Sequence, residues 1–431
     1  MATMATCSLS AVRILVWSCL LANLASAYVP TSFQTELKSP TTPLMAFRSG
    51  IFQSDISAAT TTVSPKLWEF RGHQCYAEIS RPTTARGMGL DGWNNPSSRR
   101  KIKPEVVLIH GFGCSSTYWR ETRQAFNDAG YTVHALDLLG QGKSAKPGRA
   151  DNIEYSINLW AQMVEEYTEK FIPRQTRVVL IGNSLGSMVA LSAATGDHRD
   201  SDEYSVCSLP LRIQGIGMYN CGIGMNSRNL LKDPSLNSFQ RIIFTALFNT
   251  LDTLIFGNIP LLKYILEDVV TMDLLRNALL GLYQYSSEPE RRVDDVLVES
   301  FYLPAKDQGS VEALSQIYTN DAGKTPMELH ADHAEFLNKI PLHLVWGTKD
   351  NVTPIAGPVG QFYMDLAKNP EEKVSLSLVD AGHIPFDEIP ESNNFMIEWL
   401  DGIVASKEYD MASDSKAKLF PWSTTFGKFL Q

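Results

Sequence analysis

Cysteines are scarce in this sequence, and their spacing is not typical of a metal site or a disulfide framework. Six of the 431 residues are cysteine, and no Cys-x-x-Cys pair occurs. Zinc sites and disulfide-rich folds both require close, regular cysteine spacing, so neither is indicated. The four cysteines beyond the N-terminal segment are predicted to be free thiols, mostly buried: Cys75, Cys114, Cys207 and Cys221.

Basic runs are also missing. The chain has 38 Lys and Arg against 47 Asp and Glu, a net charge of −9, and its longest basic run is Arg99-Arg100-Lys101. A phosphate-binding surface needs a basic face, so we expect no nucleic-acid partner. His330 and His333 lack an acidic or cysteine partner at ligand spacing and are expected to be surface residues. The sequence therefore predicts no metal and no other cofactor.

The N-terminal segment has the composition of a targeting presequence. Arg13 precedes an apolar run over 14–24, too short to cross a bilayer as a stable helix, and Ala25-Ser26-Ala27 is a small-x-small cleavage signature. Residues 1–27 are predicted to be a signal peptide. Residues 28–65, rich in Ser, Thr and Pro and poor in acids, are predicted to be a transit-peptide-like segment. The pair resembles the presequences of algae with secondary plastids, although Tyr28 stands where those usually carry Phe. We expect plastid delivery, with secretion as the alternative.

Short β-rich runs alternate with longer helical stretches from residue 68 onward, which predicts an α/β fold with a mostly parallel sheet flanked by helices. A hairpin over 68–79 turns at Arg71-Gly72, and a polar surface loop follows over 83–103. Further strands are predicted over 106–109, 132–136, 177–181, 213–218, 342–345 and 374–379, and helices over 155–171, 187–194 and 395–404. The core is expected to comprise 66–221 and 338–405, and the tail 406–431 is assigned no structure.

Between residues 222 and 337 the strand pattern gives way to helical apolar periodicity, which predicts a helical cap inserted between two strands. Its stretch 242–266 is especially apolar. One interpretation is a substrate pocket or a membrane-facing surface that admits a long isoprenoid or acyl chain; the other is ordinary packing between cap helices and core. Asp252, Lys263 and the break over 257–260 argue against a transmembrane helix. The candidate substrate contacts are aromatic or large aliphatic residues: Phe244, Phe248, Leu251 and Phe256.

The pentapeptide Gly182-Asn-Ser-Leu-Gly186 lies between a predicted buried strand and a predicted helix. In a G-x-S-x-G elbow the serine occupies a sharp, strained strand-to-helix turn, and the two glycines allow neighbouring chains to approach. The N-terminus of the following helix directs N–H groups toward the reaction centre. We therefore predict that Ser184 is a nucleophile, with Gly182 and Gly186 as the glycines of the elbow.

The remaining parts of such a site have candidates along the chain. His110-Gly-Phe-Gly113 follows the first buried strand, so the Phe112 amide should pair with the Leu185 amide as an oxyanion hole. His110 itself is expected to be a structural hydrogen-bonding residue. His383 follows the strand over 374–379 and is the predicted general base.

Asp350 follows the strand over 342–345 and is the predicted acid, because the chain order Ser, Asp, His is the one this elbow motif uses. The rivals Asp380 and Asp387 are too near His383 in sequence to lie on a different strand end.

Several segments together resemble the plastid α/β-hydrolases of the pheophytinase and chlorophyll dephytylase group. They are WEFRGH at 68–73, HGFG at 110–113, HALDLLGQGKSAKP at 134–147, GNSLG at 182–186, WGTKDNVTP at 346–354 and GHIPFDEIPE at 382–391. The resemblance covers about 66–221 and 338–402 and is weaker in the cap. It implies the α/β-hydrolase fold, the same catalytic residues and hydrolysis of the phytol ester of chlorophyll or pheophytin. Ser187 departs from the group, which usually has glycine there, and a slightly looser helix–strand contact is expected.

The predicted function is hydrolysis of a bulky apolar carboxylic ester, with the plastid pigment ester as first choice. A general lipid or carboxylic-ester hydrolase is the main alternative, and a carbon–carbon bond hydrolase would use the same triad. A ligand receptor on a hydrolase scaffold would also keep all these residues. The expected partners are an apolar small-molecule ester and, peripherally, a thylakoid or other plastid membrane.

Overall fold

A computed structural model describes residues 62–82, 103–199 and 209–406. The predicted signal peptide, most of the transit-like segment, the loop over 83–102, Cys207 and nearly all of the tail lie outside the described residues. Strand β1 begins at Thr62, inside the segment predicted as transit-like.

The described residues contain an eight-stranded sheet in the order β1-β2-β4-β3-β5-β6-β7-β8. The hairpin of β1 and β2, with its turn at Arg71-Gly72, is antiparallel, as is the pairing of β2 with β4; the other neighbours are parallel. The mostly parallel sheet predicted from the sequence is therefore confirmed. The strands are β1 (Thr62–Phe70), β2 (His73–Arg81), β3 (Glu105–Ile109), β4 (Val133–Asp137), β5 (Val178–Ser184), β6 (Ile213–Cys221), β7 (Leu342–Gly347) and β8 (Val374–Val379).

Helices cover both faces of the sheet, which explains why the central strands are continuously apolar. In β3, Val107 and Ile109 join the cluster that contains residues of α3 and α4. Val106 and Leu108 point to the opposite face, into the cluster with residues of α2 and α16. The helices of this core are η3 (Ser116–Trp119), α2 (Arg120–Asp128), η4 (Arg149–Asp151), α3 (Ile157–Phe171), α4 (Leu185–Thr195), α5 (Leu209–Arg212), α14 (Pro358–Lys368), α15 (Pro385–Glu388), η8 (Pro390–Ser392) and α16 (Asn393–Ala405).

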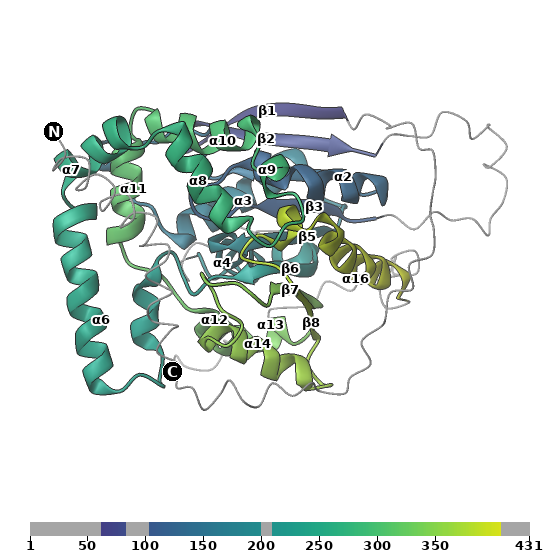
Figure 1. Ribbon diagram of the computed structural model, residues 1–431. Coiled ribbons are helices and arrows are strands. Elements are labelled where there is room, and N and C mark those ends of the chain that lie inside the picture. The colour runs from purple at the N-terminus through teal and green to yellow at the C-terminus, as the bar shows by residue number, and fades with distance from the viewer. Residues whose placement is uncertain (1–61, 83–102, 200–208, 407–431) are drawn as a thin grey trace, which may run out of the picture.

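Between β6 and β7 the chain is helical. Figure 1 shows α6 of this inserted segment along one edge of the molecule, away from the sheet. Several of its helices contact the core: α9 packs against α15, α10 against η3, and α12 against α4 and α14. The segment comprises η5 (Ser227–Lys232), α6 (Ser238–Leu251), η6 (Asp252–Phe256), α7 (Ile259–Tyr264), η7 (Ile265–Val269), α8 (Met272–Leu282), α9 (Pro289–Arg292), α10 (Asp295–Lys306), α11 (Ser310–Thr319), α12 (Pro326–Asp332) and α13 (Ala334–Leu337).

Three cysteines and two histidines can be compared with their predictions. Cys75, Cys114 and Cys221 are free and buried, as predicted, and burial raises the pKa of the Cys75 thiol to about 12. The prediction that His330 is a surface residue is wrong. Its half-buried ring lies edge-on to Phe362 and Tyr363, and burial lowers its pKa to about 4. His333 is also half-buried and is bonded to Asp197, 2.8 Å from Nε2 to the carboxylate.

Candidate active site

Ser184 occupies a strained turn between a strand and a helix. It ends β5, precedes the first residue of α4, and has φ 53° and ψ −121°. Its half-buried side chain does not cap the helix. A non-glycine residue holds positive φ only where the surrounding structure fixes it, and such strain is concentrated at functional sites. The Ser184 hydroxyl is thus presented at the carboxyl edge of the sheet by the backbone itself.

The glycines on either side of Ser184 are required by close backbone packing. A Cβ atom on Gly182 would lie 2.2 Å from the carbonyl oxygen of Gly186, and one on Gly186 would lie 2.1 Å from that of Ile109. No side chain fits at either position. Ser187 is fully buried, and its hydroxyl donates to the Gly182 carbonyl at 3.0 Å. That bond ties the helix to the strand, so the contact expected to be looser is held by the serine itself.

The two predicted oxyanion donors are the amide that follows the serine and an amide of the loop after β3, which passes the serine at Gly111, where a Cβ atom would lie 3.4 Å from Ser184 Cβ. Leu185 is the first residue of α4, where an amide has no intrahelical acceptor. Phe112 lies in the loop after β3, and no described residue accepts a hydrogen bond from the Phe112 amide. The loop is held in place because the Gly113 amide donates to Gln141 Oε1 at 2.6 Å. Gln141 belongs to the predicted 134–147 segment, so that motif supports the loop.

His110 is bonded to backbone through both ring nitrogens. Nε2 accepts from the Leu138 amide at 3.0 Å, and Nδ1 is 2.6 Å from the Gly111 carbonyl oxygen. A neutral ring with its proton on Nδ1 satisfies both contacts. Burial lowers the pKa of His110, which favours that neutral form. The interpretation of His110 as a structural residue is confirmed.

Asp350 and His383 lie next to each other after the ends of β7 and β8. His383 Nδ1 is 2.8 Å from Asp350 Oδ2, with the aspartate buried and the histidine half-buried. Burial by itself raises the pKa of the Asp350 carboxyl, but the charge and hydrogen bond of His383, with further bonds from Asn220 and Thr353, hold that pKa below its usual value. Asp350 is therefore ionised at neutral pH. A buried carboxylate here fixes the proton of His383 on Nδ1 and leaves Nε2 free to accept one.

Two residues that the sequence analysis missed complete the environment of Asp350. Asn220 Nδ2 donates to Asp350 Oδ2 at 2.5 Å and to the Gly382 carbonyl at 3.3 Å, while its Oδ1 accepts from the Gly347 amide at 3.1 Å. Thr353 Oγ1 donates to the same carboxylate oxygen at 2.7 Å. Asn220 has φ 46°, a conformation that asparagine adopts more readily than most residues. The available signal was a polar asparagine next to the last residue of the buried strand β6, which pairs with the strand of Ser184.

One hydrogen bond joins the serine turn to the histidine loop, and another joins the serine turn to the residue after β6. Asn183 Nδ2 donates to the His383 carbonyl at 3.3 Å, and the Gly222 amide donates to the Ser184 carbonyl at 3.1 Å. Within the described residues, His383 is hydrogen-bonded to Asp350 but not to the Ser184 hydroxyl. Such catalytic contacts are often long until substrate binds.

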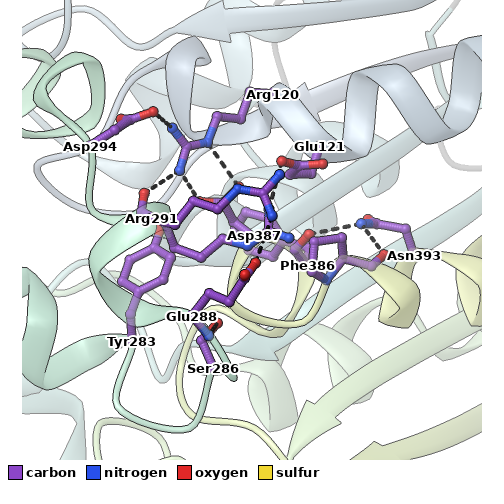
Figure 2. Close-up of polar contacts among 12 residues, drawn as sticks. Arg120, Glu121, Tyr283, Ser286, Glu288, Arg291, Asp294, Phe386, Asp387 and Asn393 are labelled. Atoms are coloured by element: carbon purple, nitrogen blue, oxygen red, sulfur yellow. Dashed lines mark hydrogen bonds and ion pairs between the residues drawn. The ribbon is translucent and has the colours of Figure 1, made fainter. Parts of the chain in front are cut away.

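The rival carboxylates have other partners. Asp380 pairs with Lys349 at 2.8 Å. Asp387 is fully buried, accepts from Arg120 at 3.2 and 3.3 Å, and accepts from the Tyr283 hydroxyl at 2.5 Å. Figure 2 shows Arg120 between Asp387 and Asp294 of the inserted segment. Asp387 therefore anchors the histidine loop to the inserted segment.

Glu388 forms a second anchor between the histidine loop and the inserted segment. Its carboxylate accepts from the Gly382 amide at 2.6 Å and from the Tyr285 amide at 2.8 Å. Burial raises the pKa of Glu388 despite these amide hydrogen bonds. The carboxylates at 387 and 388 in the GHIPFDEIPE segment thus fix the loop that carries His383 from two sides.

The four candidate substrate contacts divide into two groups. Phe256 is buried, and its ring stacks on Tyr318 at a centroid distance of 3.8 Å. Tyr318 in turn contacts the Phe112 ring at 5.2 Å, so Phe256 is linked to the loop beside Ser184. Phe244, Phe248 and Leu251 lie on the half-buried side of α6, with the two phenylalanine rings stacked at 6.4 Å. Among the described residues no group of three or more His, Cys, Asp or Glu could hold a metal ion.

The α/β hydrolase family model matches residues 106–392, more than half of the chain. The chain belongs to the α/β-hydrolase family. The predicted fold class is thereby confirmed, and the protein is a hydrolase of this family.

Several relatives are similar to this α/β-hydrolase. An uncharacterized protein of Mycobacterium tuberculosis is 24% identical over 338 residues, 77% of this chain and 85% of that protein. Probable lysophospholipase BODYGUARD 2 of Arabidopsis thaliana is 36% identical over 104 residues, 23% of this chain and 21% of that protein. A pimeloyl-acyl-carrier-protein methyl ester esterase of Aliivibrio fischeri is 34% identical over 107 residues, 25% of this chain and 37% of that protein.

Solved structures support the same fold. A haloalkane dehalogenase from Bradyrhizobium elkanii is similar with a TM-score of 0.51 and 14% identity, covering 79% of this chain and 97% of that one. A putative acyltransferase from Salmonella enterica has a TM-score of 0.50 and 20% identity, covering 79% and 95%. At such identities the likeness shows the fold and not the reaction. The narrower resemblance to the plastid pheophytinase group stays a prediction.

Proposed function

We propose that the protein is a serine esterase in which Ser184 is the nucleophile, His383 the general base and Asp350 the residue that orients the histidine. The observation that carries this proposal is the hydrogen bond between buried Asp350 and His383, after the ends of β7 and β8, at the same edge of the sheet as the positive-φ serine that ends β5. Nucleophile, base and orienting carboxylate on separate strand ends are what acyl transfer through serine requires.

In the first half-reaction the Ser184 oxygen bonds to the ester carbonyl carbon while its proton passes to His383 Nε2. The carbonyl oxygen becomes an oxyanion, and the amides of Phe112 and Leu185 are the proposed donors that stabilise it. One such donor is worth about 3 kcal/mol of barrier in other hydrolases. The intermediate then breaks its bond to the alcohol oxygen, which takes the proton from His383 and leaves as the free alcohol.

In the second half-reaction water gives a proton to His383 Nε2 and bonds to the acyl carbon. The Ser184–acyl bond breaks, the serine oxygen recovers the proton, and the carboxylic acid leaves. Asp350 stays ionised throughout and stabilises the imidazolium.

The substrate we propose is a bulky apolar ester, first of all the phytol ester of chlorophyll or pheophytin. The support is the aromatic stack of Phe256 on Tyr318 against Phe112, together with the half-buried apolar side of α6. These surfaces suit a long hydrocarbon chain that leads away from the reacting carbonyl. We further propose delivery to a plastid by the two-part presequence, followed by peripheral association with its membranes.

A general lipid esterase is the second candidate, because curated relatives include proteins named as a probable lysophospholipase and as a methyl ester esterase. The two candidates differ in the ester cleaved and share every catalytic step. A hydrolase-fold receptor would differ from both by retaining its ligand and turning over slowly.

The test incubates the full chain and its Ser184→Ala variant with chlorophyll a, pheophytin a and a short p-nitrophenyl ester, followed by separation of the products. Release of phytol by the wild type alone supports the pigment ester and the nucleophile together. Cleavage of the short ester alone would overturn the pigment substrate and leave the esterase mechanism in place. Equal cleavage by both proteins would overturn the role of Ser184.

A further inference from the structure

Helix α6 carries an exposed row of apolar side chains on the side facing away from the protein. Phe239 is 71% exposed and Ile242 67% exposed, with Ile243 and Ala246 also exposed. Leu254, at 58%, lies farther along on η6, after the exposed polar residues Asn249, Thr250 and Thr253. The spacing of three and four residues places the first four of these on one face of the helix. We call Phe239, Ile242, Ile243, Ala246 and Leu254 the outer row.

Packing within the protein does not account for the outer row. The half-buried residues of α6, such as Phe244, Phe248 and Leu251, lie on the opposite face, so the contact with the rest of the molecule is already made there. No residue of α6 is buried. The expectation that ordinary packing explains this apolar stretch therefore holds for the inner face and fails for the outer row. Clustered exposed apolar residues of this kind mark interaction sites.

The apolar character of the region reaches that of membrane segments. Among the described residues no single helix is long and apolar enough to span a bilayer, but Ser238–Phe256 and Ile259–Val269 together pass that test, with a bend of 67° between them. Core helices that pass it are mostly buried, whereas α6 has no buried residue. The second half of the pair contributes buried residues, among them Leu262 and Ile265, so α6 is the part of the pair that is free to lie in the interface of a bilayer.

Charge favours lipid over an acidic or polar partner. The only charged side chain of α6 is Arg241, so the helix presents no carboxylate to a negatively charged lipid surface, although the chain as a whole is acidic. Arg241 donates to the Asp233 carbonyl and so is held at one side of the helix. The nearest acid, Asp252, pairs with Arg228. The outer row is thus an uncharged, acid-free ridge.

The ridge leads toward the candidate site. Two residues after Leu254, the chain reaches Phe256, which is buried and stacked on Tyr318. Tyr318 contacts Phe112, whose amide is a proposed oxyanion donor. Successive ring contacts from Phe256 through Tyr318 to Phe112 thus connect the end of η6 with the loop beside the elbow.

We propose that the outer row docks the protein on a lipid bilayer, with α6 lying in the interface, and that the ester substrate enters from the bilayer past Phe256. The proposal of membrane binding rests on the exposed outer row and does not depend on the reaction. The proposal that substrate enters from the bilayer rests on the proposed function. The proposal commits to lipid as the occupant; a second copy of the chain is the competing occupant.

The test measures sedimentation of the full chain with vesicles of phosphatidylcholine containing phosphatidylglycerol, together with hydrogen exchange of individual peptides. The variant is Phe239→Ser/Ile242→Ser, and the control is Leu211→Ser, which removes a 76% exposed leucine from α5 of the core. We expect vesicles to slow exchange in peptides covering 238–256, and the double variant to lose this protection with at least a tenfold weaker partition. Leu211→Ser should match the wild type.

Hydrolysis of a short soluble ester should stay within about twofold in all three proteins, which keeps docking and catalysis separate. Vesicle binding is also measured with Ser184→Ala, so a failure of the proposed chemistry would leave the docking result readable. Unchanged exchange over 238–256 on adding vesicles would overturn the proposal. So would light scattering that shows a dimer which the double variant dissociates, with no exchange change on vesicles.

Discussion

The carboxyl edge of the sheet buries hydrogen-bonded polar groups, whereas helix α6 of the inserted segment exposes apolar side chains. At the sheet edge, Asp350 accepts five hydrogen bonds, from His383, Asn220, the Val352 amide, and the amide and hydroxyl of Thr353. Along α6 no residue is buried, and apolar side chains face outward. The proposed catalytic carboxylate is held by several hydrogen bonds, while the exposed apolar side chains lie on one helix at the edge of the molecule.

The sheet edge and the inserted segment meet at the histidine loop, through residues that follow α8. Asp387 and Glu388 each bond to the inserted segment, through the Tyr283 hydroxyl and the Tyr285 amide. Displacement of the inserted segment therefore strains the loop that carries His383. The following predictions alter one region at a time.

The largest contrast is expected between two Gly→Ala substitutions. At Gly186 the new methyl group would lie 2.1 Å from the Ile109 carbonyl oxygen, so the elbow cannot close and we expect little folded, soluble protein. At Gly281 in helix α8 nothing lies within 4 Å, so alanine should raise the free energy of unfolding by about 0.5–1 kcal/mol through helix propensity. Denaturation followed by circular dichroism measures both. A Gly186→Ala protein as stable as wild type would contradict the close contact between Gly186 and the Ile109 carbonyl.

Replacement of Asp350 by Asn is expected to lower kcat for a short ester by about 10⁴-fold while leaving the fold intact, because the amide cannot hold the imidazole tautomer or stabilise imidazolium. Steady-state assays of short-ester hydrolysis at neutral pH, with the wild type and the variant, measure kcat. A loss smaller than tenfold would transfer the orienting role to another carboxylate.

The same substitution predicts a pH dependence of stability. Since the folded-state pKa of Asp350 is held below its ordinary value of 3.8, its ionised form stabilises the protein above that value. This contribution is lost as the pH falls through the folded-state pKa. The difference in unfolding free energy between wild type and Asp350→Asn should therefore shrink as the pH falls from about 5, through 3.8, toward the lower folded-state pKa. A difference that grows toward acid would mean that burial, which raises the pKa, outweighs the hydrogen bonds.

Asn220 is expected to have a smaller effect on rate. Asn220→Gly keeps the positive φ but removes the amide that joins Asp350, Gly382 and Gly347. We predict a fall in kcat of about 10–100-fold with KM nearly unchanged. The reason is that Asp350 loses a hydrogen bond that positions it, so the His383 ring it orients is misaligned. Asn220→Ala should lose further stability at positive φ. A Gly variant with wild-type kcat would show that Asn220 serves the fold alone.

The smallest effect is expected at the junction with the inserted segment. Tyr283→Phe removes a hydrogen bond from buried Asp387, which still accepts from Arg120. We predict a loss of about 1–3 kcal/mol in unfolding free energy and less than a tenfold change in kcat. Urea denaturation and the short-ester assay measure the two quantities. A large loss of kcat without a loss of stability would show that the Tyr283–Asp387 hydrogen bond positions His383 for catalysis and does not merely stabilise the fold.

The sequence predicted the sheet edge well and the inserted segment less well. The strands and the elbow were predictable because buried parallel strands are continuously apolar and because Gly182 and Gly186 leave a motif of fixed spacing. The Asp350–His383 pair could be proposed from chain order, and the structure brings the two residues together. Asn220 was missed because its role depends on positive φ and on three partners that are distant from it in sequence.

The inserted segment was less predictable because its periodicity does not say which face is covered. The apolar positions of α6 lie on both sides of the helix, and only packing distinguishes Phe244 on the inner face from Ile242 on the outer one. His330 shows the same limit: its burial comes from Phe362 and Tyr363 on another helix, which its own sequence neighbourhood does not reveal.

The nucleophile is tested most directly by covalent labelling. A fluorophosphonate bonds to a serine oxygen that a neighbouring base has activated, and the adduct is located by mass spectrometry of the peptides. We predict a single adduct on Ser184, slow labelling in His383→Ala, and no labelling or ester hydrolysis in Ser184→Ala. An adduct on another serine, or a Ser184→Ala protein that hydrolyses the short ester at the wild-type rate, would contradict the account.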